Sequence, residues 1–412
     1  MAPPKEVEDA FASTFKLIFG QCSNKLEDYK EYLLSAHHPP FIRASCLSKK
    51  PIVLSSDRYE ESAKFISQDE IAALPKAKPL SINEIKDLDS VVEAMGGRAY
   101  YTGNKQFGSS EHISESDNCL DSFFVHGSHT IQASKYVAYS SYVRENSEHI
   151  FGGTTMLRSR FLIHCLAADS LTRSFESHFC ITSSDLFFCF GCVACSDAMF
   201  SFNLHSKRNC IGNLELPKER YLALKKKLVE ESREYLEKHK KFYSMFAYPA
   251  PTKADLAPLP ITRRPANSGP AAAGSGPASG PAFDIRPIEQ TFASTTKVIL
   301  GKEMGPMEKF LPMLNRRTRK IREIRTSFGG KAYCTDVLMF PYVTPSRLVN
   351  NEESQALGER HIALLEGESP ALAELLKKIS PVLFLRAEFH EGQNSNCAVG
   401  QVFYTCPTSI RC

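Results

Sequence analysis

The sequence lacks several features that would assign it to a common class of protein. It has no tryptophan among 412 residues, and no apolar run of about 18 residues that could span a membrane. Its 50 basic and 46 acidic residues leave a net charge of only +4, too small to indicate a nucleic-acid or membrane surface. Glu6, Glu8 and Asp9 interrupt the apolar core that a signal peptide would need. We therefore expect an intracellular protein whose cysteines are mostly reduced.

Sequence motifs of the common enzyme classes are also missing. There is no Walker loop, dinucleotide-binding fingerprint, nucleophile elbow or HExxH zinc motif. His390 and Cys397 lie near each other in sequence, but two strands joined by a polar turn do not promise the cleft that a cysteine nucleophile needs. The sequence therefore favours a non-enzymatic protein, and we expect no cofactor.

A six-residue period dominates the middle of the chain. An apolar residue follows each of the repeated serines by three positions, and after a short slip the period continues as apolar-x-small pairs as far as Met199 and Ser201. Residues i and i+2 of a strand face the same side, so an apolar and a small side chain can both face inward before the chain bends. The repeated serines are Ser110, Ser116, Ser122, Ser128, Ser134 and Ser140.

This period predicts a parallel β-solenoid from about Ser110 to Leu204. Three six-residue sides would close a coil of about 18 residues, giving roughly five coils. We expect the inward side chains to include Val125, Val137, Ile163, Phe187 and Val193.

The repeat resembles the hexapeptide-type β-solenoids, and also uncharacterised microbial families of short serine- and cysteine-rich repeats. The resemblance implies the architecture that hexapeptide acyltransferases and γ-class carbonic anhydrases share. Those families space their aliphatic and small residues as aliphatic-x-x-x-small, whereas the spacing here is apolar-x-small.

The whole chain is predicted to be an α+β multidomain protein, with the central parallel β-solenoid capped by a long amphipathic helix and flanked by small helical and α+β domains. We expect helices at 6–19, 25–34, 66–74, 82–95, 217–243, 307–325, 353–366 and 371–379, and strands at 382–389 and 398–405. The predicted domains are a mixed helical module at 1–105, the solenoid at 106–212, the capping helix at 213–248, a Pro/Ala/Gly linker at 249–282, and an α+β domain at 283–412 that partly resembles the first module.

Two short motifs recur on either side of the solenoid. The segment from Phe11 to Gly20 is identical at seven of ten positions to the segment from Phe292 to Gly301, and a Gly-Gly-basic-Ala-Tyr motif recurs after each. We interpret this as a duplicated docking module, with the alternative that each helix only completes the core of its own domain. The predicted partner-binding residues are Phe11, Leu17, Phe19, Phe292, Val298 and Leu300.

A basic cluster follows the second motif. If 307–325 is one helix, its basic side chains share much of one face, which could bind an acidic protein surface or a nucleic acid, or could simply be solvated. The residues are Arg316, Arg317, Arg319, Lys320 and Arg322.

The cysteines and histidines of the solenoid are the candidate metal ligands. Cys189, Cys192 and Cys195 have the spacing of a zinc or cluster motif, but serine occupies the same small column elsewhere and cannot replace a thiolate ligand. Buried thiols are therefore the favoured interpretation, and zinc is the alternative. We expect His112, His126, His129, His149, His164 and His178 to lie mostly on the surface or in loops, with a metal site shared between subunits as the alternative.

Together these patterns predict a structural or scaffolding component of a large assembly, docking on other protein subunits through its flanking modules. One alternative is a solenoid enzyme of the acyltransferase or metal-dependent lyase type. The other is a factor that binds nucleic acid or the ribosome.

Overall fold

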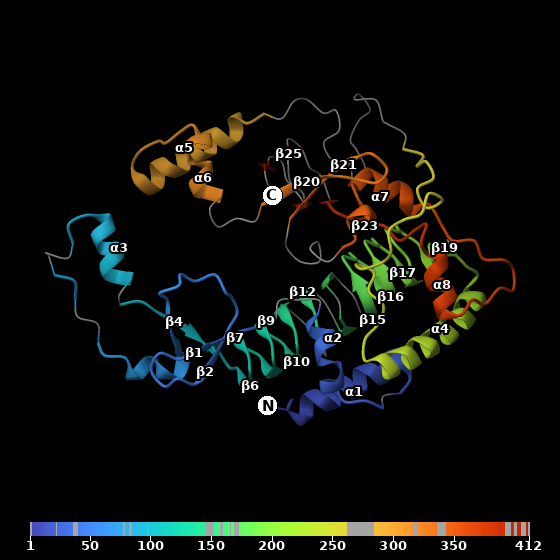
Figure 1. Ribbon diagram of the computed structural model, residues 1–412, viewed down its shortest axis with the longest axis horizontal. Helices are drawn as coiled ribbons and strands as arrows, with labels where there is room; N and C mark the ends of the chain where they lie inside the picture. The colour runs from blue at the N-terminus through green and yellow to red at the C-terminus, as the bar shows by residue number, and fades with distance from the viewer. Residues whose placement is uncertain are drawn as a thin grey trace. The chain divides into compact units, whose positions relative to one another are not determined.

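The computed structural model describes the chain apart from residues 1, 22, 36–39, 77–78, 82–84, 97, 145–150, 157–159, 165, 169–172, 262–283, 316–319, 336–342, 392–396, 399–401, 405–408 and 411–412. The chain forms two compact units (Figure 1). The first comprises Met1–Leu186 with Ser232–Phe242, and the second comprises Phe187–Glu231 with Tyr243–Cys412. Both contain helices and parallel strands, so the predicted α+β multidomain class with a parallel β-solenoid is confirmed.

The first unit contains helices α1, α2 and α3, the end of the long helix α4, and most of the described solenoid strands. Its elements are α1 Lys5–Phe19, η1 Leu26–Tyr29, α2 Lys30–Leu34, β1 Phe41–Ala44, β2 Pro51–Leu54, β3 Lys64–Ser67, η2 Gln68–Ala73, α3 Leu88–Gly96, β4 Tyr100–Gly103, β5 Gln106–Phe107, β6 Glu111–Ser114, β7 Asp117–Leu120, β8 Phe123–His126, β9 His129–Gln132, β10 Lys135–Ala138, β11 Ser141–Val143, β12 Thr154–Met156, β13 Phe161–Ile163, β14 Leu166–Ala168 and β15 Arg173–His178.

The second unit contains the last solenoid strands and the C-terminal elements. Strand β16 Ser184–Phe190 and helix α4 Lys218–His239 each contain a boundary between the units. The other elements are β17 Ser196–Met199, β18 Arg208–Ile211, β19 Leu214–Glu215, α5 Arg286–Leu300, η3 Met307–Phe310, α6 Leu311–Leu314, β20 Ile321–Arg325, β21 Lys331–Thr335, η6 Pro345–Arg347, β22 Leu348–Val349, α7 Asn351–Gly358, α8 Leu372–Lys378, β23 Leu385–Arg386, β24 Phe389–Glu391, β25 Cys397–Ala398, β26 Val402–Tyr404 and β27 Ser409–Ile410.

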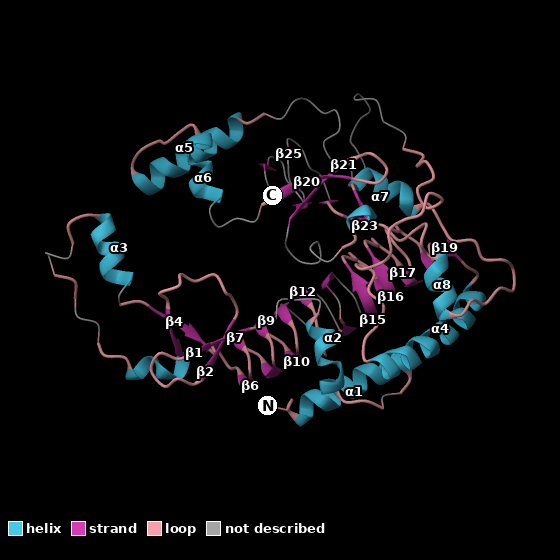
Figure 2. Ribbon diagram, viewed as in Figure 1, coloured by secondary structure: helices cyan, strands magenta, loops and turns pink. Residues whose placement is uncertain are grey.

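The solenoid coil has two sides, not three. Ile113 of β6 pairs in parallel with Val125 of β8, which pairs with Val137 of β10, so adjacent coils are 12 residues apart. The intervening strands β7, β9 and β11 form a second sheet (Figure 2). The predicted 18-residue coil and its count of five are therefore wrong, because two six-residue repeats close one coil, and the chain makes about seven turns.

The slip in the sequence period is one residue inserted into a coil. Ser141 of β11 pairs with Thr154 of β12, and Ala138 forms a bridge with Phe151, so each of these pairs spans one residue more than the regular coil. The following pairs, such as Thr154 with Leu166, return to the regular spacing. The insertion therefore changes the phase of the serine column without ending the solenoid.

Small hydroxyl side chains connect successive coils inside the solenoid. Ser116 Oγ accepts a hydrogen bond from the amide of Ser128 at 3.0 Å and donates to the carbonyl of Ser114 at 2.7 Å. The hydroxyl of Ser122 likewise accepts from the amide of Ser134. Each ladder serine therefore satisfies one backbone N–H of the next coil, which a buried backbone requires.

Two of the expected inward side chains, Val125 and Val137, stack in one column of the solenoid core and are buried. Ile163 is buried too, but it faces α1 and not the inside of the coil, because it pairs in register with Phe151 and Phe175, whose rings contact Phe11 and Phe19. Phe187 is buried and Val193 is half-buried. The first unit adds the apolar face of α1, which contacts β8, β10, β13 and β15.

Several predicted elements have other boundaries or another type. The helix at 217–243 is α4, 66–74 is β3 followed by a 3-10 turn, and the helix at 353–366 ends with α7 at Gly358. The helix at 307–325 is wrong in its second half, because 321–325 forms a strand that pairs with β21 in an antiparallel hairpin.

Candidate functional site

The first helical module, α1 to α2, is held together by its own contacts and covers the solenoid. The Leu26 amide donates to Glu8 Oε2 at 3.0 Å, and the rings of Phe11 and Tyr29 lie 5.6 Å apart. Two edge-on ring pairs then connect α1 to the coils, Phe11 with Phe151 at 5.3 Å and Phe19 with Phe175 at 5.0 Å. The apolar face of α1 is thus part of the core of the first unit.

The second module, α5 to α6, repeats these internal contacts at corresponding positions. The Met307 amide donates to Glu289 Oε2 at 2.9 Å, and the rings of Phe292 and Phe310 lie 5.6 Å apart. Both long helices end at a left-handed glycine, Gly20 in α1 and Gly301 in α5, where a residue without Cβ is least strained. The sequence similarity therefore reflects a repeated three-dimensional module.

The two modules differ in what covers their apolar face. Phe19, Tyr32 and Leu33 of the first module are 3%, 8% and 0% exposed. Their counterparts in the second module, Leu300, Met313 and Leu314, are 62%, 65% and 42% exposed, and α5 has no buried residue. We call the set Phe292, Leu300, Met313 and Leu314 the α5–α6 face.

The predicted partner-binding apolar residues fall into three groups. Phe11 and Phe19 are buried in the solenoid core, so they are core residues in this structure and cannot also bind a partner without leaving it. Leu17 and Val298 are exposed at corresponding positions, 53% and 86%, and the first module shows that this position is not covered even when the module is packed. Phe292 is half-buried and Leu300 is exposed on the α5–α6 face.

Only Lys320 and Arg322 of the predicted basic helical face lie among the described residues, and neither is in a helix. Arg316, Arg317 and Arg319 lie outside the described residues. Lys320 is exposed before β20, and Arg322 is exposed on that strand and pairs in register with Cys334. The pattern was misread because an arginine-rich segment suits a helix, whereas the Gly329-Gly330 turn joins two strands here.

The three cysteines of the candidate zinc motif lie in the small column of the solenoid. Cys189, Cys192 and Cys195 are buried thiols, and each Sγ contacts the carbonyl two residues earlier, as the ladder serines do. A hydrogen bond that the Cys195 thiol donates to Cys192 and burial both raise the pKa of Cys195 far above the ordinary thiol value. Over the described part of the chain, no group of three or more His, Cys, Asp or Glu side chains is arranged to hold a metal ion.

Four solenoid histidines are buried, which corrects the expectation that they lie mostly on the surface. His126 and His129 of the first coils are 0% and 1% exposed, and His164 and His178 are 7% and 0% exposed. Neighbouring groups cover these rings: His126 Nδ1 lies 2.8 Å from Ser114 Oγ, and the His164 ring lies 4.3 Å from the Tyr32 ring of the first module. His112 is exposed, as expected, and His149 lies outside the described residues.

A polar cluster in the first unit is centred on Glu176 of β15. His164 Nδ1 donates to its Oε1 at 2.5 Å, His178 Nε2 donates to its Oε2 at 3.2 Å, and the Tyr32 hydroxyl also donates to it. Burial alone would raise the pKa of Glu176, but its electrostatic interaction with the His164 imidazole and the hydrogen bonds from both imidazoles outweigh burial and lower that pKa to about 2. Ser35, exposed at the end of α2, lies with Oγ 3.1 Å from His164 Nε2.

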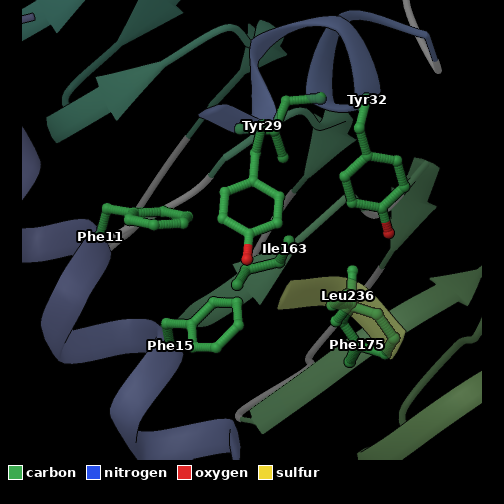
Figure 3. A pocket seen from close by; sticks show the side chains of 8 residues that line it. Phe11, Phe15, Tyr29, Tyr32, Ile163, Phe175 and Leu236 are labelled. Atoms are coloured by element: carbon green, nitrogen blue, oxygen red, sulfur yellow. The ribbon is translucent and has the colours of Figure 1, made fainter. Parts of the chain in front are cut away.

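An aromatic cluster, drawn in Figure 3, shares Tyr32 with the polar cluster. Eight side chains from α1, the α2 region, the solenoid and α4 surround the space and leave no room in it for a water-sized molecule. It is therefore packed core between α1 and the coils, and not a ligand pocket. The lining residues are Phe11, Phe15, Tyr29, Tyr32, Leu33, Ile163, Phe175 and Leu236.

The duplication extends beyond the helices. In the first copy Ser45 Oγ donates to Glu70 at 2.6 Å beneath the β1–β2 hairpin, and in the second Thr326 Oγ1 donates to Glu353 at 2.6 Å beneath β20–β21. Strands β24 and β26 then pair in parallel, as do β25 and β27, in the way that the solenoid begins at β5 and β7. The strands expected at 382–389 and 398–405 are thus not a hairpin, because their partners run parallel.

Comparison with known proteins gives no relative for this chain. No family model, curated protein or solved structure matches it.

Within the described residues, no helix combines the length and the apolar character needed to cross a membrane.

Proposed function

We propose that this protein is a structural or scaffolding component of a macromolecular assembly, and that it docks on another protein subunit through the α5–α6 face. One observation carries the proposal: a module that buries its apolar face in the first unit leaves the corresponding face exposed in the second. Large exposed apolar side chains gathered on one module are typical of an interaction surface.

The first module indicates the chemistry of the partner. There the face packs on stacked parallel strands, and the rings of Phe11 and Phe19 in α1 make edge-on contacts with the rings of Phe151 and Phe175. A partner that presents the flank of a β-solenoid, with aromatic and aliphatic side chains and few charges, would fit the α5–α6 face in the same way. We therefore propose a solenoid flank on another subunit as the occupant.

The size of the α5–α6 face sets the affinity that docking could have. Burying Leu300, Met313 and Leu314 would contribute roughly 1.5–3 kcal/mol each before the costs of association. Those costs are about 4–15 kcal/mol, so the three side chains alone support weak docking. The predicted linker at 249–282 is in its first part packed in the second unit, where Arg347 donates to the Pro249 carbonyl and Arg360 to the Pro258 carbonyl, and its remainder from 262 lies outside the described residues.

Site-specific photo-crosslinking in the native host tests the proposal. A photoreactive residue at position 300 should crosslink to the solenoid strands of a partner subunit, whereas the same residue at position 298 should not. Leu300→Glu should release the protein from its assembly, as seen by native mass, and Val298→Glu is the matched control because its position is exposed in both modules. Equal crosslinking at 298 and 300, or an assembly unaffected by Leu300→Glu, would refute docking through this face. Crosslinks confined to nucleic acid would refute the choice of a protein partner.

A further inference from the structure

Three side chains at the end of α2 and on adjacent solenoid coils form a hydrogen-bonded series. Ser35 Oγ lies 3.1 Å from His164 Nε2, and His164 Nδ1 donates to Glu176 Oε1 at 2.5 Å. His164 and Glu176 occupy equivalent positions one coil apart, as shown by the pairing of Ile163 with Phe175. The 12-residue coil therefore places the imidazole directly beside the carboxylate.

We propose that Ser35 is a nucleophile for acyl transfer, with His164 as its general base and Glu176 as the residue that positions the base. An accessible hydroxyl, an imidazole and a buried carboxylate, connected in this order, are the arrangement that activates serine in unrelated folds. The proposal goes beyond the docking function and does not rest on it, because none of the three residues belongs to the α5–α6 face.

The burial of the three groups follows the order that the chemistry needs. Ser35 is exposed and can meet a substrate, His164 is 7% exposed, and Glu176 is 2% exposed. A carboxylate can only accept hydrogen bonds, so Glu176 fixes the Nδ1–H of His164 and directs Nε2 toward Ser35. The Tyr32 ring, 4.3 Å from the imidazole by centroids, holds the ring from one side.

A serine whose only role is to end a helix would need fewer contacts than Ser35 has. Ser35 Oγ also donates to the Tyr32 carbonyl at 2.7 Å, which is the contact of an ordinary helix end. That contact requires neither an imidazole at 3.1 Å nor a buried carboxylate behind it. Rotation of the hydroxyl from the carbonyl to His164 Nε2 would make the nucleophile ready.

The reaction uses only an ester and water. Ser35 Oγ attacks the carbonyl carbon and its proton passes to His164 Nε2; the ester C–O bond breaks, and the leaving alcohol takes that proton. Water then attacks the acyl-serine, gives a proton to His164, and releases the acid as the proton returns to Ser35. Because the neighbouring aromatic cluster is closed, the acyl group must lie on the solvent side, which favours small acyl groups.

Labelling of the full chain with a fluorophosphonate probe, read by intact mass and peptide mapping, tests the proposal. We expect one adduct, located on Ser35, and slow hydrolysis of p-nitrophenyl acetate by the same protein. Ser35→Ala should abolish both without changing the melting temperature, because the side chain is exposed. Ser23→Ala is the matched control: this exposed serine donates to Glu237 at 2.8 Å and, within the described part of the chain, makes no hydrogen bond to an imidazole. It should label like the wild type.

Two further variants separate a catalytic role from a structural one. His164→Gln should lower the labelling rate at least about 10²-fold. Glu176→Gln should slow labelling and also move its pH midpoint to lower pH, because the imidazolium that forms loses its carboxylate partner. Absence of an adduct on folded wild-type protein, an adduct on another residue, or a labelling rate unchanged in His164→Gln would overturn the proposal. Since Ser35→Ala and Ser23→Ala are surface changes, the first result stands even if the buried variants fail to fold.

Discussion

Replacing one ladder serine should weaken the solenoid locally by a predictable amount. Ser116 is 3% exposed, and its Oγ accepts the amide of Ser128 in the next coil at 3.0 Å. In Ser116→Ala the buried Ser128 amide loses this acceptor, whereas the carbonyl of Ser114 keeps the Gly127 amide as a donor at 3.1 Å. One unsatisfied buried donor costs about 1–3 kcal/mol.

Hydrogen exchange measured by mass spectrometry is the suitable assay, because two compact units need not unfold in one step. A loss of about 1–3 kcal/mol corresponds to roughly 5–150-fold faster exchange in a peptide that covers Ser128. Ser116→Cys should fall between alanine and the wild type, since sulfur fits this column but accepts hydrogen bonds weakly. Ser62→Ala, at an exposed serine, is the control and should change stability by less than about 0.5 kcal/mol. Unchanged exchange in Ser116→Ala would show that the hydroxyl ladder does not hold the coils together.

The remaining predictions concern pH, the two modules and the thiols. Burial lowers the pKa of His178 below its ordinary 6.5, so as pH falls the unfolded chain binds the proton before the folded chain does. The first unit should therefore lose stability as pH falls below about 6.5. Hydrogen exchange of its solenoid peptides at pH 7 and pH 5, corrected for intrinsic exchange rates, measures this loss. Burial raises the pKa of Glu388 to about 7, so its contribution to the stability of the second unit has the opposite dependence on pH: it is present below about 4.5 and is lost as pH rises to 7. Glu388→Gln should remove this pH dependence of stability from the second unit. Phe19→Glu should lower the melting temperature of the first unit by placing a charge in its core, whereas Leu300→Glu should leave circular dichroism and melting unchanged. Cys189→Ser should be tolerated within about 1–2 kcal/mol, and chelators should not alter melting, because serine already occupies this column elsewhere.

The sequence period was sufficient to predict strands and, in the first coils, their inward residues such as Val125 and Val137, but not the number of strands in a coil. Both sides of the coil use the same apolar and small residues, so successive six-residue repeats look alike whether two or three of them close a turn. The pairing of Val125 with Val137 decides between the two. Residues outside the core do distinguish the two, because the stacked rings of His112, Phe124 and Tyr136 recur every 12 residues and so indicate a 12-residue coil.

The candidate nucleophile could not have been found from sequence alone. His164 and Glu176 are neighbours only if the coil has 12 residues, and the expected 18-residue coil separated them. Ser35 comes from a helix far away in sequence, and its position depends on how α2 packs against the solenoid. By contrast, the duplicated module was visible in the sequence, because Phe11 and Phe292 head nearly identical segments.

The differences between the two modules fit their different surroundings. Phe15 of α1 is 2% exposed and contacts the rings of Phe11 and Phe19, at 5.8 and 4.7 Å, so it belongs to a permanent core. The corresponding residue of α5 is Thr296, whose hydroxyl accepts the Met304 amide at 3.0 Å within its own module. An exposed phenylalanine there would add apolar surface that promotes aggregation. The threonine removes that surface while the Phe292–Phe310 ring pair, which holds the module together, is kept. The second module thus retains the fold of the first with a less apolar face, which suits a contact that forms and releases better than one buried at folding.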